Sequence, residues 1–207
     1  MDDLEKIFKK FNCDKHFHGY HNVYSEYLQS KRNDELNILE IGVLNGSSLN
    51  AWLEYLPNSK IYAVDTFERV NSDEIDILNH ERVTWFEGDS TRINLPDLCD
   101  VQFDFIIDDG LHTSNNQRRT FNNLFRMLKP EGFYIIEDVY ASRLITNRQQ
   151  EKIELNLKNW FDKNCSVSEY DSLIETLRTF GSSLEIFNLN RLSKTQKANS
   201  CLLIIGK

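Results

Sequence analysis

Residues 37–48 read Asn37-Ile38-Leu39-Glu40-Ile41-Gly42-Val43-Leu44-Asn45-Gly46-Ser47-Ser48, and this stretch decides the fold. The first five residues form a short apolar run, which is typical of a strand that is buried on both faces. Two glycines then mark a turn. From residue 47 to 56 apolar side chains recur at helical spacing. This order predicts one strand–helix unit, with the amino terminus of the helix at the turn.

Similar apolar runs predict a sheet of several strands. They cover residues 60–64, 83–86, 103–107, 133–136, 184–187 and 201–205. A helical pattern over 115–128 separates the fourth strand from the fifth, so strands and helices alternate, as in a doubly wound α/β sheet. The last two strands are joined by a polar loop and predict an antiparallel edge. We therefore expect a seven-stranded, mostly parallel sheet, with ligands beyond the carboxyl ends of its strands.

The length and composition predict a single globular domain. The 207 residues fit one domain, in which residues 1–33 form a short helical cap and residues 34–207 form the core. Helical patterns cover residues 4–11 and 23–30 of the cap, and an amphipathic helix is predicted over 148–164. The cysteines are scattered and are expected to be reduced packing residues. They are Cys13, Cys99, Cys165 and Cys201.

The charge and hydropathy argue against two classes of partner. A formal net charge of -8 disfavours nucleic acid, since binding to phosphates requires clustered Lys and Arg. The chain has no apolar run long enough to cross a bilayer, and its first residues do not resemble a secretion signal. We expect a cytoplasmic protein with neither a nucleic-acid nor a membrane partner.

The turn after the first strand predicts a ligand cradle. Gly42 permits a tight turn, Gly46 permits a close backbone approach, and the helix amino terminus at Ser47 presents N–H groups. Asp65 ends the second strand, where a carboxylate can accept hydrogen bonds from both hydroxyls of a ribose. Asp89 follows the third strand and can contact an adenine edge or a backbone amide. The pattern indicates a nucleoside cofactor, although each feature also occurs in turns that bind nothing.

Carboxylates follow the fourth and fifth strands. The fourth ends in Asp108 and Asp109, with His112 three residues further on, and the fifth ends in Glu137 and Asp138. If the two strands are neighbours, three of these carboxylates meet and repel one another unless a cation or protons intervene. Oxygen ligands with positions left open suit magnesium, and His112 could then act as a base. Taken one at a time, these residues could equally be turn, strand-end or helix-cap residues.

The cap contains histidines and aromatic residues whose role is open. His16, His18 and His21 lack a nearby carboxylate pattern, so we expect packing or substrate contact rather than a transition-metal site. The aromatic residues are Phe17, Tyr20, Tyr24 and, after the fifth strand, Tyr140. Such rings either line a pocket or pack the cap onto the sheet, and we favour packing for most of them. His18, Tyr20 and Tyr140 are the candidates for substrate contact.

Taken together, these residues resemble the Rossmann-like class I methyltransferases, which use S-adenosylmethionine. The matching motifs are Glu40-Ile41-Gly42 with Gly46-Ser47-Ser48, Val64-Asp65, Glu87-Gly88-Asp89, Ile107-Asp108-Asp109-Gly110-Leu111-His112, Leu128-Lys129-Pro130-Glu131-Gly132 and Ile136-Glu137-Asp138. The chain is most similar to the magnesium-dependent sugar O-methyltransferases of macrolide biosynthesis, of the mycinamicin and tylosin type, and to their cephalosporin-hydroxylase-like relatives. The stretch from Asp14 to His21 also resembles the amino-terminal motif of that family.

The resemblance implies a function and a set of site residues. The cofactors would be S-adenosylmethionine and Mg²⁺, and the substrate a hydroxyl of a small sugar-like or nucleotide-sugar molecule. The implied metal ligands are Asp109, Glu137 and Asp138. The implied catalytic residues are His112, as general base, and Asp109. The predicted cofactor contacts are Glu40, Gly42, Gly46, Ser47, Asp65, Asp89 and Asp108.

Three other functions and one assembly are left open. The cofactor loop is also similar to that of catechol-type methyltransferases, so a planar diol could be the acceptor. A non-catalytic module that binds S-adenosylmethionine is the alternative from another class, since folds are reused without their chemistry. A hydroxylase-like activity ranks third, because the sequence has no evident arrangement of two histidines and one carboxylate for iron. A homodimer is compatible with the sequence.

Overall fold

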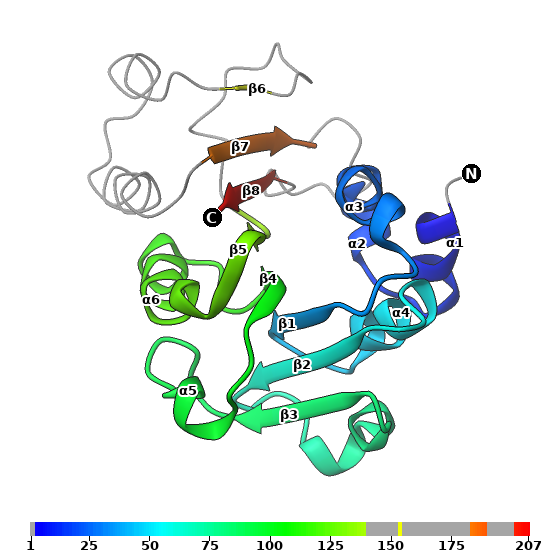
Figure 1. Cartoon of the computed structure of the whole chain (residues 1–207). Helices are drawn as coiled ribbons and strands as arrows, with labels where there is room; N and C mark the ends of the chain where they lie inside the picture. The colour runs from blue at the N-terminus through cyan, green and yellow to red at the C-terminus, as the bar shows by residue number, and fades with distance from the viewer. Residues whose placement is uncertain (1–2, 140–152, 155–182, 190–200) are drawn as a thin grey trace.

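The computed structural model describes residues 3–139, 153–154, 183–189 and 201–207. A single sheet runs through the centre of the molecule (Figure 1). Its strands are β1 (Asn37–Ile41), β2 (Lys60–Asp65), β3 (Val83–Glu87), β4 (Phe103–Asp108), β5 (Leu128–Ile136), β6 (Ile153–Glu154), β7 (Ser183–Asn188) and β8 (Cys201–Gly206). Their order in space is β3-β2-β1-β4-β5-β8-β7-β6. The strands from β1 to β5 are parallel, whereas β8 pairs antiparallel with both β5 and β7.

The topology confirms a mixed α/β, Rossmann-like fold with an antiparallel edge, but the predicted number of seven strands is not confirmed. Within the described residues the sheet has eight strands. The additional one, β6, pairs with β7 through Ile153 and Ile186 and lies inside the range predicted as a helix over 148–164. For the two residues of β6, Ile153 and Glu154, pairing with the open edge of β7 overrides the helical pattern of the sequence. The rest of that range lies outside the described residues.

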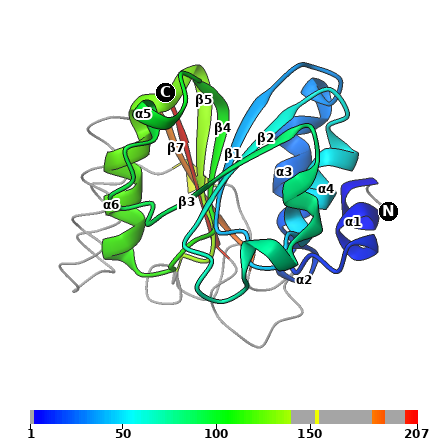
Figure 2. The same cartoon turned by 90° about the horizontal axis from the view of Figure 1, so that it is seen from below.

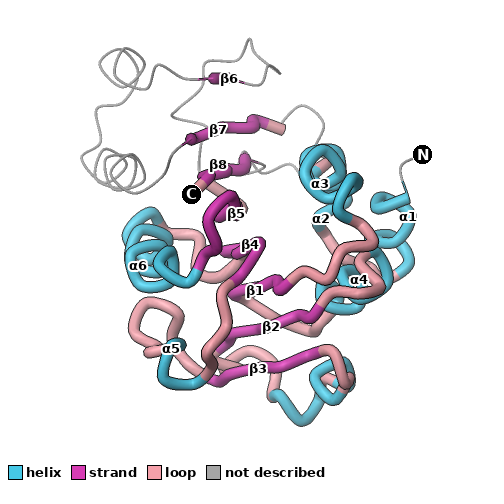
Figure 3. The backbone as a smooth tube through the Cα atoms, viewed as in Figure 1, coloured by secondary structure: helices cyan, strands magenta, loops and turns pink. Residues whose placement is uncertain are grey.

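Helices cover both faces of the sheet. They are α1 (Asp3–Lys10), α2 (Lys15–His18), α3 (Tyr20–Leu28), α4 (Ser47–Tyr55), α5 (Leu95–Leu98) and α6 (Ser114–Leu124), with short 3-10 turns η1 (Gln29–Lys31), η2 (Ser72–Glu74), η3 (Asp76–Asn79) and η4 (Phe125–Met127). Seen from below, α1, α3 and α4 lie on one side of the sheet and α5 and α6 on the other (Figure 2). Figure 3 shows the loops that join strands to helices, which lie at the ends of the strands. In the described part of the chain, no helix combines the length and the apolar character needed to cross a membrane.

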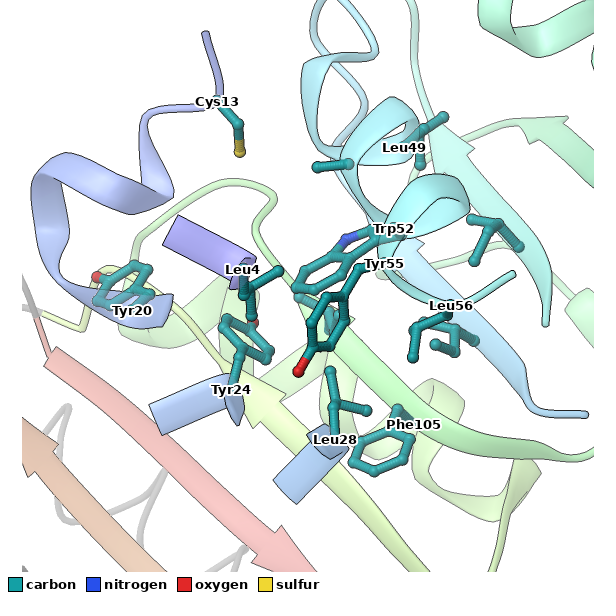
Figure 4. Packing of buried hydrophobic residues seen from close by; sticks show 14 of the residues in the cluster. Leu4, Cys13, Tyr20, Tyr24, Leu28, Leu49, Trp52, Tyr55, Leu56 and Phe105 are labelled. Atoms are coloured by element: carbon teal, nitrogen blue, oxygen red, sulfur yellow. The ribbon is translucent and has the colours of Figure 1, made fainter. Parts of the chain in front are cut away.

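The cap forms part of the hydrophobic core. Trp52 of α4 is fully buried, and its ring lies 5.3 Å from that of Phe8 and 5.0 Å from that of Tyr24. Figure 4 shows Leu4, Tyr24 and Tyr55 gathered around the same indole. Burying a Leu or Phe side chain completely, as at Leu4 and Phe8 of the cap, stabilises a fold by about 1.5–3 kcal/mol. Aromatic packing therefore holds the cap on α4, as expected for Tyr24, whereas Phe17 is 44% exposed and Tyr140 lies outside the described residues.

The boundary between α6 and β5 differs from the prediction. The expected helix over 115–128 ends earlier, at Leu124, and β5 begins at Leu128 rather than at residue 133. The pairing of β4 with β5 shifts register between Phe103 and Phe105, so the segment around Pro130 is accommodated by an irregularity. This shift brings the end of β5 level with the end of β4, since Asp108 pairs with Ile136. The residues that follow the two strands consequently lie side by side.

Candidate active site

A cleft of about 1090 Å³ opens beyond the carboxyl ends of the parallel strands. It lies where the chain changes direction in the sheet, with β2 on one side of β1 and β4 on the other, which is the usual ligand position in such folds. The cleft is lined by residues from the strand ends, the loops that follow them, the cap and α6. These are 41–45, 47 and 48 at and after the end of β1, 64–66 and 68–70 at and after the end of β2, 88–91 after β3, 109–112 after β4, 138 after β5, 12–15 and 18 from the cap, and 116 and 120 from α6. Every parallel strand thus contributes to its wall.

Two glycines shape the turn after β1. Gly42 has a φ of +91°, and a Cβ atom at this position would lie 2.2 Å from the backbone oxygen of Asp109. Gly46 has a φ of +77°, and a Cβ there would lie 2.5 Å from Cγ2 of Ile77. The atoms that lie close to these two glycines are therefore atoms of the protein itself, from Asp109 and Ile77. Gly42 in particular allows the end of β4 to lie against the end of β1.

Two of the predicted cofactor acids lie in the cleft. Asp65 accepts hydrogen bonds through Oδ2 from the N–H of Val43, at 2.6 Å, and from that of Leu44, at 3.3 Å. Its Oδ1 accepts one from the N–H of Phe67 at 2.8 Å. Asp65 thereby holds the turn in place while still facing the cleft. The hydroxyl of Thr91, and after it the N–H of the same residue, donates a hydrogen bond to the carboxylate of Asp89, and these bonds lower the pKa of Asp89.

Glu40 has a different environment from the one expected for a cofactor contact. Its side chain is fully buried and does not line the cleft. Oε2 accepts a hydrogen bond from the hydroxyl of Ser48 at 2.9 Å, and Oε1 lies 3.3 Å from Nζ of Lys15. Burial raises the pKa of Glu40. Glu40 therefore joins β1 to the first turn of α4 and to the cap.

Lys15 is the centre of a buried charge cluster. Its ammonium donates to Oδ2 of Asp109 at 2.6 Å and to both oxygens of Glu137 at 2.8 Å, besides its contact with Glu40. We call these four residues the Lys15 cluster. Burial alone would lower the pKa of Lys15, but the three carboxylates raise it well above its ordinary value, so the ammonium stays charged. Burial raises the pKa of all three acids, that of Glu137 well above its ordinary value, so at these strand ends the carboxyls compete for one ammonium and for protons.

Asp109 also belongs to a second group, which faces the cleft. One ligand atom each from Asp109, His112 and Asp138 lies within 4.8 Å of the other two. We call these three residues the cleft group. Nε2 of His112 lies 3.7 Å from Oδ2 of Asp138, and Nδ1 of His112 is buried without a hydrogen-bond partner. Glu137 is not part of the cleft group.

Asp138 is held in an unusual conformation. Its φ is +52°, which is uncommon for a residue other than glycine and marks a constrained backbone. Tyr20 of the cap donates its hydroxyl proton to Oδ1 of Asp138 at 2.5 Å and accepts the N–H of Asp138 at 3.2 Å. Nδ1 of His18 lies 3.6 Å from the same Oδ1. The cap therefore sets the direction in which this carboxylate points.

Asp108 lies behind the cleft. It is buried, accepts a hydrogen bond from the N–H of Gly110 at 3.3 Å and one from the hydroxyl of Tyr134 at 3.4 Å, and does not line the cleft wall. Burial raises the pKa of Asp108 from 3.8 to about 7, and the charge of Asp109 adds to this effect. A carboxyl whose pKa is raised by folding stabilises the protein below its unfolded pKa, and this stabilisation is lost as the pH rises through the folded pKa.

Asp108→Asn should therefore change how stability depends on pH. Between pH 5 and 8 the wild type is expected to lose about 3 kcal/mol of unfolding free energy that the variant keeps, because the amide has no proton to release. Urea unfolding of both proteins at the two pH values measures this difference. An equal gap between wild type and variant at pH 5 and at pH 8 would contradict a neutral Asp108 in the folded state.

The structure brings some of the predicted site residues together and separates others. Of the predicted metal ligands, Asp109 and Asp138 meet in the cleft group, whereas the carboxylate of Glu137 is bound by Lys15 and also accepts the hydroxyl of Tyr24. Gly42, Ser47, Asp65, Asp89 and His18 line the cleft, while Glu40, Gly46, Asp108 and Tyr20 do not. Tyr140 lies outside the described residues.

The sequence analysis missed Lys15 as part of the site, and it named Tyr24 only as an aromatic ring and not as a hydrogen-bond partner of Glu137. Both come from the cap, about a hundred residues or more from the acids that they contact, and neither stands in a periodic pattern that predicts such a contact. One signal was available. Three acids expected at one place need a counter-charge, and Lys15 is a cation in the cap motif that resembles the family.

Comparison with known proteins shows which proteins the chain resembles. A family profile described as a methyltransferase domain matches residues 39–139. The mycinamicin VI 2''-O-methyltransferase of Micromonospora griseorubida is 28% identical over 152 residues, which cover 68% of this chain and 37% of that protein. The demethylmacrocin O-methyltransferase of Streptomyces fradiae matches to the same extent. The chain thus spans little more than a third of the length of these relatives.

A solved structure has a similar fold. It is that of the MycE methyltransferase from the mycinamycin biosynthetic pathway, in complex with Mg and SAH, with a TM-score of 0.68 and 22% identity. The match covers 100% of this chain and 55% of that one. Residues 39–139, just under half of the chain, therefore contain a methyltransferase domain.

Proposed function

We propose that the protein transfers a methyl group from S-adenosylmethionine to a hydroxyl of a sugar or sugar conjugate, assisted by Mg²⁺. The observation that carries the proposal is the cleft group: Asp109, His112 and Asp138 converge in the cleft that the Gly42 turn and Asp65 also line. Binding a nucleoside does not require two carboxylates and a histidine at this place. A metal-assisted reaction on a hydroxyl uses both, because the carboxylates can bind the cation and the histidine can take the proton.

The relatives support the same class of substrate. The two curated proteins above are named as O-methyltransferases, and a third, from Streptomyces olivaceus, is named for a 2-methoxy-rhamnosyl tetracenomycin substrate. The MycE structure contains Mg and SAH. Because this chain covers only part of those proteins, its acceptor is proposed here at the level of a hydroxylated sugar.

The residues present fit both cofactors. The cleft is long enough to reach from the acids that follow β2 and β3 to the cleft group, as an extended nucleoside with an amino-acid tail requires. Asp65 would hold the ribose hydroxyls and Asp89 the base or a nearby amide. The carboxylates of Asp109 and Asp138 supply hard oxygen ligands, and a divalent cation would relieve the repulsion among the acids that meet at these strand ends.

The chain's own residues divide the chemistry between them. When bound, Mg²⁺ supplies a positive charge that makes a neighbouring hydroxyl more acidic. Asp138, fixed by Tyr20, orients that hydroxyl, and His112 takes its proton as the oxygen attacks. The new bond forms between this oxygen and the methyl carbon, the bond from carbon to sulfur breaks, and its electron pair stays on sulfur. Positioning both reactants in one cleft is a major part of the rate enhancement.

The proposal is tested by measuring S-adenosylhomocysteine release with a panel of acceptors. The panel contains rhamnosides, other glycosides, nucleotide sugars and a catechol, each assayed with Mg²⁺ and with EDTA. We expect turnover with a glycoside or nucleotide sugar, lost on chelation and restored by Mg²⁺. Mass spectrometry of the product identifies the methylated oxygen.

Each other outcome points to a different function. Turnover with the catechol alone would indicate a diol methyltransferase. Binding of S-adenosylmethionine in calorimetry, with no affinity for Mg²⁺ and no turnover, would indicate a non-catalytic module. Full activity in EDTA would contradict metal assistance while leaving methyl transfer intact.

A further inference from the structure

Leu44 occupies a turn position that is unusual for a leucine. The N–H of Gly46 donates to the carbonyl of Val43 at 2.9 Å, so residues 43–46 form a β-turn in which Leu44 is the first central residue. Its φ is +50°, and turns with a positive φ at this position favour Gly, Asn or Asp. A branched side chain in this left-handed region strains the backbone. Leu44 therefore destabilises the turn unless its side chain gains compensating contacts.

The described part of the protein leaves much of Leu44 uncovered. The residue is 52% exposed and lines the cleft. Phe67 is a useful comparison, because its φ is +54° and its N–H also donates to Asp65. The ring of Phe67, however, packs on that of Trp85, with 5.2 Å between the ring centroids. The strained backbone at Phe67 is thus compensated within the protein, whereas Leu44 faces the space that a ligand would fill.

The strand order places Leu44 between two parts of the site. Figure 1 shows β1 between β2 and β4. Asp65, the proposed ribose contact, ends β2, and the cleft group, which would bind and deprotonate the acceptor, follows β4 and β5. Leu44 follows β1, and its N–H donates to Oδ2 of Asp65 at 3.3 Å. The part of S-adenosylmethionine that spans this interval is the sulfur with its methyl and methylene groups.

From this geometry we propose that Leu44 contacts the cofactor around its sulfur atom, where the leucine side chain covers the methylene groups on either side of the sulfur. The inference rests on the proposed function, in which Asp65 holds the ribose and the cleft group holds the acceptor. Apolar surface that the ligand buries against Leu44 contributes to its affinity. The same contact would fix the position of the methyl carbon opposite the hydroxyl that it joins.

Leu44→Asn separates backbone strain from ligand contact. Asn tolerates a positive φ, so the variant should melt at or above the temperature of the wild type. It lacks the apolar contact, so the dissociation constant of S-adenosylhomocysteine should rise about fivefold or more. Leu44→Met keeps a long apolar side chain, and its dissociation constant should stay within about threefold of wild type. A leucine that only supported the fold would instead lose stability and affinity together.

The experiment is calorimetric titration with S-adenosylhomocysteine, without an acceptor, together with thermal melts of the ligand-free proteins. Leu98→Asn is the matched control, because Leu98 of α5 is 53% exposed but does not line the cleft. Its affinity should stay within about twofold of wild type. Adenosine, measured by competition, has the base and the ribose but no sulfur. Leu44→Asn should therefore change the affinity for adenosine by less than about twofold.

Several results would overturn the proposal. One is wild-type affinity of Leu44→Asn for S-adenosylhomocysteine, and another is a Leu44→Met protein that binds as weakly as Leu44→Asn. A variant that does not fold, or whose melting temperature falls by about 4 °C or more, would show that Leu44 serves the fold. Equal weakening of adenosine and S-adenosylhomocysteine would place the effect at the ribose. Wild-type protein that binds neither S-adenosylmethionine nor S-adenosylhomocysteine would instead contradict the proposed methyl transfer itself, and this inference with it.

Discussion

His112→Ala is expected to lower kcat for methyl transfer by about 10²–10⁴-fold, the range that general-base catalysis contributes. The ring is well placed for this role, since it lines the cleft, its Nε2 lies 3.7 Å from Asp138, and it follows the end of β4 by only a few residues. KM for the acceptor should change much less, because the proton is removed during the reaction and not on binding. Steady-state kinetics with the glycoside identified by the panel gives both values.

His112 of the cleft group can act as a general base or as a metal ligand, and measuring the affinity for Mn²⁺ distinguishes these two roles. If the ring is only a base, His112→Ala keeps wild-type affinity for Mn²⁺ while turnover is lost. If a ring nitrogen also ligates the metal, affinity and turnover fall together, and His112→Asn should recover part of the affinity. A variant whose kcat stays within about threefold of wild type would rule out both roles.

Gly42→Ala is expected to destabilise the fold by about 3 kcal/mol or more. The added methyl would lie 2.2 Å from the backbone oxygen of Asp109 and 2.8 Å from its carbonyl carbon, and backbone atoms have little room to move. The φ of +91° adds strain for any residue with a side chain. For a domain of this size the melting temperature should fall by about 6–12 °C.

Gly88→Ala is the matched control for this substitution. Gly88 also follows a strand of the same sheet, but its added methyl would first meet Cδ1 of Ile93, at 3.0 Å, which is the flexible end of a side chain. Its melting temperature should stay within about 3 °C of wild type. If Gly42→Ala melts as the control does, the contact between the β1 turn and the end of β4 is not needed for the fold.

The sequence predicts the sheet well because its signals are local. All seven predicted strands are present, and α4 begins at Ser47 as the glycine turn indicated. The signals fail where pairing between distant segments decides the structure. Ile153 lies in a segment with a helical pattern, yet it pairs with the open edge of β7 as part of a short strand. Around Pro130 a register shift against β4 lets β5 begin at Leu128, five residues before the predicted start.

The site is predicted less completely, for a related reason. Acids at strand ends can be placed at one edge of the sheet from topology alone, and Asp109, Asp138 and His112 do meet there. Which way each carboxylate turns depends on the partners that approach it from elsewhere in the chain. Glu137 and Asp138 are neighbours in sequence, yet one is bound by Lys15 and the other by Tyr20. Strand spacing carries no information about that choice.

The position of β8 has a consequence for how the chain is made. This strand lies between β5 and β7, although it is synthesised after both of them. Until residues 201–206 leave the ribosome, the edge of β5 has no partner on that side, and its buried residues include Tyr134, Ile135 and Ile136. An open apolar edge is a template for pairing with other chains. Nascent or shortened chains that end before β8 should therefore depend on chaperones to avoid aggregation.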